Sequence, residues 1–165
     1  MKRIYIAGPM RGIPELNFPE FYRVAAIWES RGWEVVNPAQ MDKDHGYIPT
    51  KQQTVFADLS IEQAMQRDLP AVSSCDAIAL MTGWEKSQGA SIELKHALEL
   101  RKEVYDANTG ERLWRSRLLC QYCGGLLLDE LVDRCFGVAV HYRCLPTFTV
   151  QEHTWFPAPK ASYRS

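Results

Sequence analysis

The chain has 165 residues, of which 46% are hydrophobic, so it is long enough for one α/β domain and a small addition. Its 19 Lys and Arg nearly balance its 20 Asp and Glu, and a formal charge of -1 argues against a broad nucleic-acid surface and favours a small-molecule ligand. No apolar run approaches the roughly 20 residues that span a bilayer, and the apolar start is too short for a secretion signal. We therefore expect a cytoplasmic protein with no membrane partner.

The first third of the chain predicts two strands around one helix. Residues 2–7 have the pattern of a strand, and residues 8–12 form a sharp Gly-Pro loop after it. Asn17 then precedes an early proline and apolar residues at helical spacing, which predicts a helix that ends at Gly32. Residues 33–36 predict the second strand.

The middle of the chain begins with a long polar stretch. Residues 40–58 look irregular, and a loop of that length inside a compact domain is typically functional or mobile. Ser60 and Gln63 have the spacing of a capping box for a helix, which Pro70 is expected to interrupt. Residues 77–81 are continuously apolar and predict a buried strand.

A further helix over residues 89–100 and a core strand over residues 103–105 complete the alternation of strands and helices. This order predicts an α/β fold with a Rossmann- or flavodoxin-like parallel sheet flanked by helices, and a ligand at the carboxyl ends of the strands. Residues 106–111 are rich in turn formers and predict a hairpin tip.

The segment over residues 87–93 is the strongest candidate ligand site. Ser87 and Gly89 open a helix whose first unpaired amides and positive dipole end favour an anion. Glu93 follows Gly89 by about one helical turn on the same face, so a 5′-nucleotide with its phosphate at the turn would bring its anomeric carbon to this carboxylate. Alternatively, Ser87 is an ordinary helix cap and Glu93 an exposed acid.

Five short motifs occur in order within residues 2–106. They are IYIAGPMRG at 4–12, NFP at 17–19, RDL at 67–69, CDAI at 75–78 and GWEKSQGASIE at 83–93. Together they resemble the nucleoside 2-deoxyribosyltransferase-like family, and most of all an uncharacterised branch that is common in phages and bacteria. Among characterised relatives, the chain is similar to the 2′-deoxynucleoside 5′-monophosphate N-glycosidases.

The resemblance implies roles for three residues near the reacting carbon. Glu93 would be the nucleophile that forms a covalent glycosyl-enzyme, and Asp68 the second acid, which holds the sugar or nucleophile and assists proton delivery to the base. Tyr5 would lie beside them, and we expect the helix start to keep Glu93 ionised. Alternatively, Asp68 caps a helical turn and Tyr5 packs in the core.

The resemblance also implies a phosphate site. Its members would be Gly8, Arg11, Gly12, Ser87 and Gly89, with Arg11 donating charge-assisted hydrogen bonds. The alternative for Arg11 is a solvated loop position. Pro9 stands where the monophosphate glycosidases have a serine, so this site lacks one hydroxyl. Trp84, Tyr47 or Phe18 is available either to stack on a base or to pack in the core.

These observations predict an enzyme that hydrolyses the N-glycosidic bond of a (deoxy)nucleoside 5′-monophosphate, releasing base and sugar 5-phosphate through a glycosyl-Glu93 intermediate. Base exchange by a nucleoside deoxyribosyltransferase and non-catalytic binding or sequestration of a nucleotide are the alternatives. The family's transferases often complete their site with a neighbouring subunit, so a homodimer or larger oligomer is expected. A phage-encoded chain would act in the host cytoplasm, and no organic cofactor is expected.

The last third of the chain predicts a structural Zn²⁺ site. Cys120 and Cys123 form one ligand pair and His141 and Cys144 another, with 17 residues between the pairs, which is the arrangement of a zinc knuckle or treble-clef-like module. Four protein ligands leave no open coordination position, so the metal would be structural. Cys135 is an alternative to His141 as a ligand. Alternatively, the cysteines are reduced and buried in a small hairpin.

The predicted organisation therefore has four parts. An α/β domain covers residues 1–106, a hairpin or linker 107–117, a zinc knuckle 118–146 and a tail 147–165. A further alternative is an interaction module, in which the zinc segment grips a protein or nucleic acid and the α/β domain is a scaffold.

Overall fold

The computed structural model describes residues 1–113, 132–135 and 138–141. The chain forms two units, Met1–Arg112 and Leu113–Ser165, and their boundary falls inside the predicted 107–117 connection. In the second unit, β6 (Val132–Cys135) and β7 (Val138–His141) pair as an antiparallel hairpin. Within these described residues, no helix is both long and apolar enough to cross a membrane.

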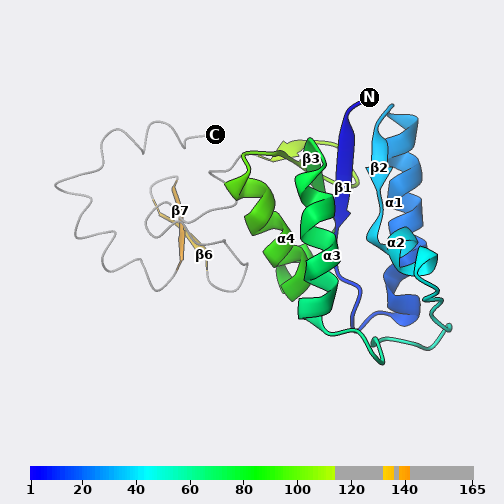
Figure 1. The fold of residues 1–165 in the computed structure, drawn as a ribbon. Helices are drawn as coiled ribbons and strands as arrows, with labels where there is room; N and C mark the ends of the chain where they lie inside the picture. Colours follow the sequence, from blue (N-terminus) through cyan, green and yellow to red (C-terminus); the bar gives the residue numbers. More distant parts are fainter. Residues whose placement is uncertain (114–131, 136–137, 142–165) are drawn as a thin grey trace. The chain divides into compact units, whose positions relative to one another are not determined.

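A five-stranded sheet forms the centre of the first unit, with the order β2-β1-β3-β4-β5 (Figure 1). Its strands are β1 (Arg3–Ala7), β2 (Glu34–Val36), β3 (Ala77–Leu80), β4 (Glu103–Asp106) and β5 (Arg112–Leu113). β1 runs parallel to β2 and β3, and β3 runs parallel to β4. The expectation of a wholly parallel sheet is wrong at one edge, because the predicted hairpin tip returns the chain onto β4 as β5, with Asp106 N donating to Glu111 O at 2.8 Å.

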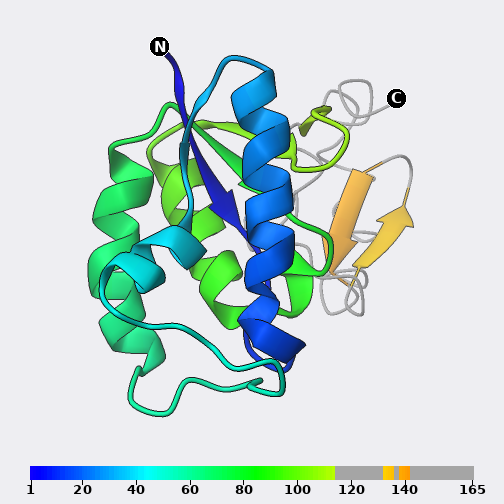
Figure 2. The ribbon, with the colours of Figure 1, turned by 90° about the vertical axis from the view of Figure 1, so that its right-hand side faces the viewer.

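Helices cover both faces of this sheet (Figures 1 and 2). One face packs on α1 (Phe18–Ser30), whereas α3 (Ile61–Ser73) and α4 (Gln88–Glu99) lie side by side on the other. The alternation of β1 explains the two layers, since Ile4 and Ile6 join the core beneath α1 while Tyr5 points toward α4. The flavodoxin-like arrangement is therefore confirmed in its helical layers and its parallel strands.

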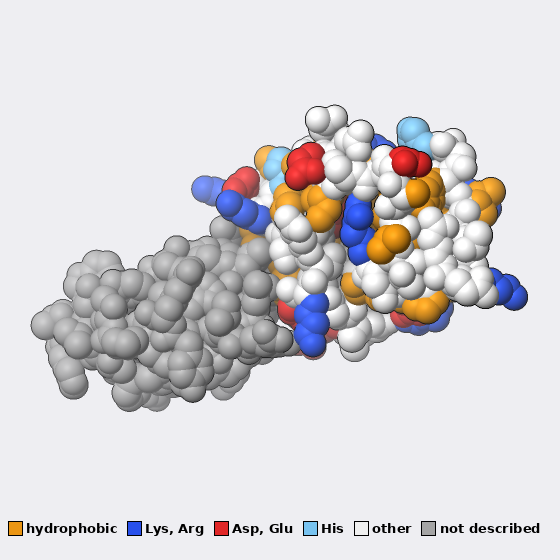
Figure 3. All heavy atoms as spheres, turned by 90° about the horizontal axis from the view of Figure 1, so that it is seen from below, with side chains coloured by type: hydrophobic (Ala, Val, Ile, Leu, Met, Phe, Trp, Pro, Cys, Tyr) orange, Lys and Arg blue, Asp and Glu red, His pale blue; other side chains and the backbone are white. Residues whose placement is uncertain are grey.

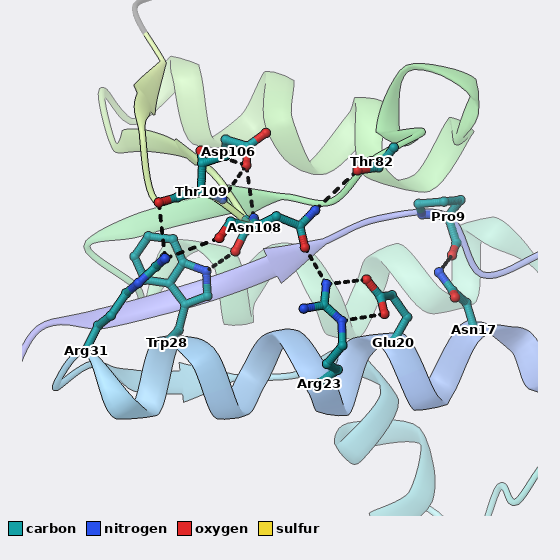
Figure 4. A network of polar contacts seen from close by, with 11 residues as sticks. Pro9, Asn17, Glu20, Arg23, Trp28, Arg31, Thr82, Asp106, Asn108 and Thr109 are labelled. Atoms are coloured by element: carbon teal, nitrogen blue, oxygen red, sulfur yellow. Dashed lines mark hydrogen bonds and ion pairs between the residues drawn. The ribbon is translucent and has the colours of Figure 1, made fainter.

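The loop after β1 is fastened to the start of α1. A short 3₁₀ helix, η1 (Pro14–Asn17), precedes α1, and Asn17 occupies the cap position with φ of 62°. Its side chain makes no capping bond to α1; it donates instead to the carbonyl of Pro9 at 2.7 Å (Figure 4). The predicted helix start is thus confirmed, although Asn17 acts by holding the loop.

Two helices differ from the sequence-based expectation. Helix α2 (Pro38–Asp44) runs into the stretch 40–58 that was expected to be irregular, and it begins at Pro38 because Asn37 accepts a capping bond from Ala39 N at 2.9 Å. Helix α3 continues through Pro70, and its predicted capping box at Ser60 is confirmed. Packing after the proline holds this helix together, since Val72 is fully buried.

The turn between β4 and β5 is anchored to α1 by polar contacts (Figure 4). Asp106 Oδ1 accepts from the amides of Asn108 and Thr109 at 3.0 and 2.8 Å. Trp28 Nε1 donates to the Ala107 carbonyl at 2.9 Å, and Arg23 contacts the Asn108 side chain. These contacts hold the turn between β4 and β5 against α1.

The loops after β1 and β3 leave the sheet toward opposite faces, which opens a crevice between the carboxyl ends of these two strands.

Candidate active site

A cavity of about 260 Å³ occupies this crevice at the carboxyl ends of β1 and β3. The loop after β1 contributes residues 8–11, and α3 and α4 contribute the opposite wall. Figure 3 views the protein from this end of the strands, where basic side chains lie among hydrophobic ones. The remaining lining residues that matter for chemistry are Asp42, Phe56, Leu59, Met65, Arg67, Asp68, Lys86, Ser87, Gln88, Gly89 and Glu93.

Glu93, which lines this cavity, is hydrogen-bonded to the buried Tyr5. Tyr5 is fully buried on β1, Glu93 is 5% exposed on α4, and Tyr5 Oη donates to Glu93 Oε1 at 2.7 Å. The reading of Glu93 as an exposed acid is therefore wrong. Tyr5 is a core residue, as the alternative held, and its hydroxyl nevertheless contacts the candidate nucleophile.

Asp68 lies on the same side of the cavity, on α3. It is 4% exposed, and its Oδ1 accepts from Nε and Nη2 of Arg67, each at 2.8 Å. Arg67 also donates through Nη1 to Oδ1 of Asp42 on α2. The alternative that Asp68 caps a helical turn is wrong, because the residue sits inside a continuous helix and is paired with a cation.

Burial controls the ionisation of these acids. Loss of solvation, together with the nearby charge of Asp68, raises the pKa of Glu93 to about 8, against smaller opposing effects of Tyr5 and Arg67. The expectation that the helix start keeps Glu93 ionised is therefore wrong, since Glu93 is the sixth residue of α4 and the dipole effect is confined to the first turn. Burial also raises the pKa of Asp68.

The start of α4 offers hydrogen-bond donors to the same cavity. Ser87 is the helix cap, as the alternative for it held, since its Oγ accepts from Ala90 N at 3.3 Å. The amides of Gln88 and Gly89 enter no hydrogen bond within the described residues, and both residues line the cavity. Lys86 lines the cavity beside them, so a cation and two unpaired amides converge there.

Arg11 also lines the cavity, at its rim. Its guanidinium donates to the Leu59 carbonyl and lies 5.1 Å from the centre of the Phe56 ring. These contacts bind the loop after β1 to the segment before α3. They also hold a second positive charge at the cavity, so Arg11 is not simply a solvated loop residue.

The two predicted glycines of the first loop behave differently. Gly8 lines the cavity, and a side chain there would bring Cβ within 2.8 Å of Met81, so the close approach of the ends of β1 and β3 requires glycine. Gly12 does not line the cavity. Its φ of +82° requires glycine, and its amide donates to Thr54 O at 2.7 Å, so it does not contribute to the predicted phosphate site.

The aromatic residues that were candidates to stack on a nucleotide base lie away from the cavity. Trp84 and Phe18 are 8% and 6% exposed core residues, and Tyr47 packs against Phe56 with ring centres 4.9 Å apart. None of the three lines the cavity, whereas Phe56 does.

Three charged residues line the cavity but were not predicted as site residues from the sequence. Arg67 and Lys86 are next to predicted site residues in the chain, and Asp42 lies in the stretch that was expected to be irregular. The Asn37-Pro38 pair is a helix-start signal that could have revealed α2 and with it Asp42.

The predicted zinc ligands fall mostly outside the described residues, where Cys120, Cys123 and Cys144 lie. Cys135 ends β6 and His141 ends β7, and the pairing of Cys135 with Val138 and of Val132 with His141 places the two at opposite ends of the hairpin. Among the residues that the structure does describe, no three His, Cys, Asp or Glu side chains are grouped to hold a metal.

Comparison with known families gives one match. A family model described as a domain of unknown function, DUF4406, matches residues 2–106. No curated protein matches the sequence. The matched range contains every residue of the cavity described above. The chain therefore belongs to the DUF4406 family.

Proposed function

We propose that the first unit hydrolyses the N-glycosidic bond of a (deoxy)nucleoside 5′-monophosphate. One observation carries this proposal: a buried carboxylate, Glu93, accepts a hydrogen bond from Tyr5 in a cavity that is also lined by Lys86 and by Gln88 and Gly89 with their unpaired amides. The resemblance of the motifs to the nucleoside 2-deoxyribosyltransferase-like family supports the same chemistry. A sugar phosphate would be held at both ends, with its anomeric carbon at the carboxylate.

Binding places the phosphate at the start of α4. The amides of Gln88 and Gly89, the Ser87 hydroxyl and the cations of Lys86 and Arg11 all favour a dianion. Glu93 lies one helical turn further along α4, on the side of Tyr5. The sugar therefore spans the distance between an anion site and a carboxylate.

Glu93 then acts as the nucleophile and Asp68 as the proton donor in bond cleavage. The Glu93–Asp68 pair begins with one proton, which resides on Glu93 in the empty site because the pKa of Glu93 is about 8. On substrate binding the proton passes to Asp68. Oε2 of the ionised Glu93 bonds to the anomeric carbon as the C–N bond breaks, while Oε1 keeps its bond from Tyr5. The base leaves with the C–N electron pair and takes the proton from Asp68.

Water completes the cycle. It attacks the anomeric carbon of the glycosyl-Glu93 ester, its proton passes to Asp68, and the bond between the sugar and Oε2 breaks. The products are free base and sugar 5-phosphate. The pair again holds one proton, so the enzyme returns to its starting state.

Incubation with a panel of nucleosides and nucleoside 5′-monophosphates tests the proposal. Released base is measured by chromatography with and without an added acceptor base. We expect the monophosphates to release base without an acceptor. Products that form only with an acceptor would make the protein a transferase, and no release from any compound would refute the catalytic proposal.

Lys86 provides a test of the phosphate end. Replacing Lys86 by Met is expected to raise KM for monophosphates by roughly ten-fold, because one charge-assisted contact is lost, and to leave kcat nearly unchanged. Lys95→Met is the matched control, since Lys95 is an exposed lysine of α4 outside the cavity. Equal KM values for the two variants would remove Lys86 from the site.

A structural Zn²⁺ in the second unit is a separate proposal, supported by the spacing of Cys120, Cys123, His141 and Cys144. The purified full chain is expected to contain about one zinc per molecule, measured by atomic emission. Cys123→Ser should reduce the zinc content to background. Retention of zinc in that variant, or no zinc in the parent chain, would contradict the proposal.

A further inference from the structure

One guanidinium links three elements of the cavity wall. Arg67 of α3 donates through Nη1 to Asp42 of α2, and through Nε and Nη2 to the neighbouring Asp68. Both carboxylates are nearly buried, with side-chain exposures of 4% for Asp42 and 6% for Asp68. Since a lone buried charge is costly, each acid depends on the same cation.

Each acid has one oxygen held by the protein and one left open. Among the described residues, Oδ2 of Asp42, Oδ2 of Asp68 and Oε2 of Glu93 accept no hydrogen bond. All three residues line the cavity. The oxygen of Asp68 that would carry a proton to the base is therefore free, while the other oxygen is fixed by Arg67.

The titratable groups that interact with Asp68 lie on α2, α3, α4 and β1. Arg67 on α3 favours its ionised form, whereas Asp42 on α2 and burial favour its neutral form. The charge of Asp68 in turn raises the pKa of Glu93 on α4 and of Tyr5 on β1. Asp42 has no comparable effect on Glu93. Asp42 thus acts on the pair of acids only through Arg67 and Asp68.

We propose that Asp42 is a positioning residue for proton donation: by occupying one side of the Arg67 guanidinium, it keeps that cation from pairing with Asp68 alone. The proposal rests on the proposed function, in which Asp68 protonates the departing base. Without Asp42, the whole positive charge of Arg67 faces Asp68, which then stays ionised. A base that needs a proton to leave would be released slowly, although Glu93 and the phosphate site are intact.

The test compares two leaving groups in the full-length chain. Purine nucleoside 5′-monophosphates need a proton on the base, whereas their N7-methyl derivatives carry a positive charge already and release a neutral base. Asp42→Asn is expected to lower kcat for guanosine 5′-monophosphate or its deoxy form by roughly 100-fold, the usual contribution of a general acid. For the N7-methyl compound we expect a change of less than about three-fold, since no proton is transferred.

Asp44→Asn is the matched control, because Asp44 is an exposed acid of the same helix that bonds to Gln40 and does not line the cavity. A second measurement needs no turnover: carboxyl ¹³C titration by NMR should show a lower pKa of Asp68 in Asp42→Asn than in the parent chain. An equal loss on both nucleotides, or an unchanged Asp68 titration, would overturn the inference.

The two proposals fail in different ways. If the parent chain releases no base from any nucleotide, the proposed function fails, and the NMR titration still decides whether Asp42 sets the charge on Asp68. If the parent chain is active and Asp42→Asn slows both leaving groups alike, the proposed function stands and the positioning role of Asp42 is wrong.

Discussion

Replacing Glu93 by Gln is expected to reduce base release by roughly 10⁴-fold or more, because an amide cannot form the glycosyl ester. The amide oxygen can still accept the hydrogen bond that Tyr5 donates at 2.7 Å, so the cavity should keep its shape. The measurement is kcat under saturating nucleotide, with released base quantified by chromatography. Binding of the sugar 5-phosphate, measured by calorimetry, should be retained because the phosphate contacts are unchanged.

Glu99→Gln serves as the control for this experiment. Glu99 is an exposed acid at the end of the same helix, α4, and does not line the cavity. Its replacement should leave kcat within about two-fold of the parent value. Activity of Glu93→Gln close to that of Glu99→Gln would show that Glu93 is not the nucleophile.

The same substitution is expected to stabilise the protein at neutral pH. The pKa of Glu93 is about 8 in the folded chain, against an ordinary glutamate pKa of 4.5. Between these values the unfolded chain gives up a proton that the folded chain keeps, so the stability of the parent protein falls as pH rises. The loss is complete above about pH 8 and amounts to roughly 3 kcal/mol at pH 7, from about 1.4 kcal/mol per pH unit. Glu93→Gln has no such loss.

Urea unfolding of both proteins at several pH values between 4 and 8 measures this difference. Titrating groups far from Glu93 contribute equally to both proteins, so the difference in unfolding free energy reports the titration of Glu93 together with the Asp68 and Tyr5 groups coupled to it. It should be smallest near pH 4 and grow steadily toward pH 8. A difference that does not change with pH would mean that the folded protein holds Glu93 ionised in the normal range.

Much of the fold followed from local patterns. The apolar runs of β1 and β3 and the capping box at Ser60 are local signals, and each element that they predicted is present. The hairpin tip before β5 was predicted, but β5 as a strand of the sheet was not, because a two-residue strand has no pattern of its own and only its pairing with β4 defines it. The continuation of α3 through Pro70 depends on packing, which outweighs the local preference for a break.

The site was predictable only where its residues lie in recognisable motifs. Glu93, Asp68 and Tyr5 were predicted in this way; Glu93 and Asp68 line one cavity, and Tyr5 donates a hydrogen bond to Glu93 from the core behind it. Asp42 was not predicted: the Asn37-Pro38 pair could have revealed its helix, but the contact that Arg67 makes with it from another helix is not visible in the sequence. The raised pKa of Glu93 was equally hidden, since burial is a property of the assembled fold.

Part of the cavity lining is apolar. Phe56 and Leu59 belong to the segment between α2 and α3, which contributes no charged side chain to the lining. This segment contacts the loop after β1, as in the bond from Arg11 to the Leu59 carbonyl, and its Tyr47 and Phe56 pack against the core. If the proposed function holds, exchanging this one segment between relatives should change the base preference while Asp68 and Glu93 stay in place.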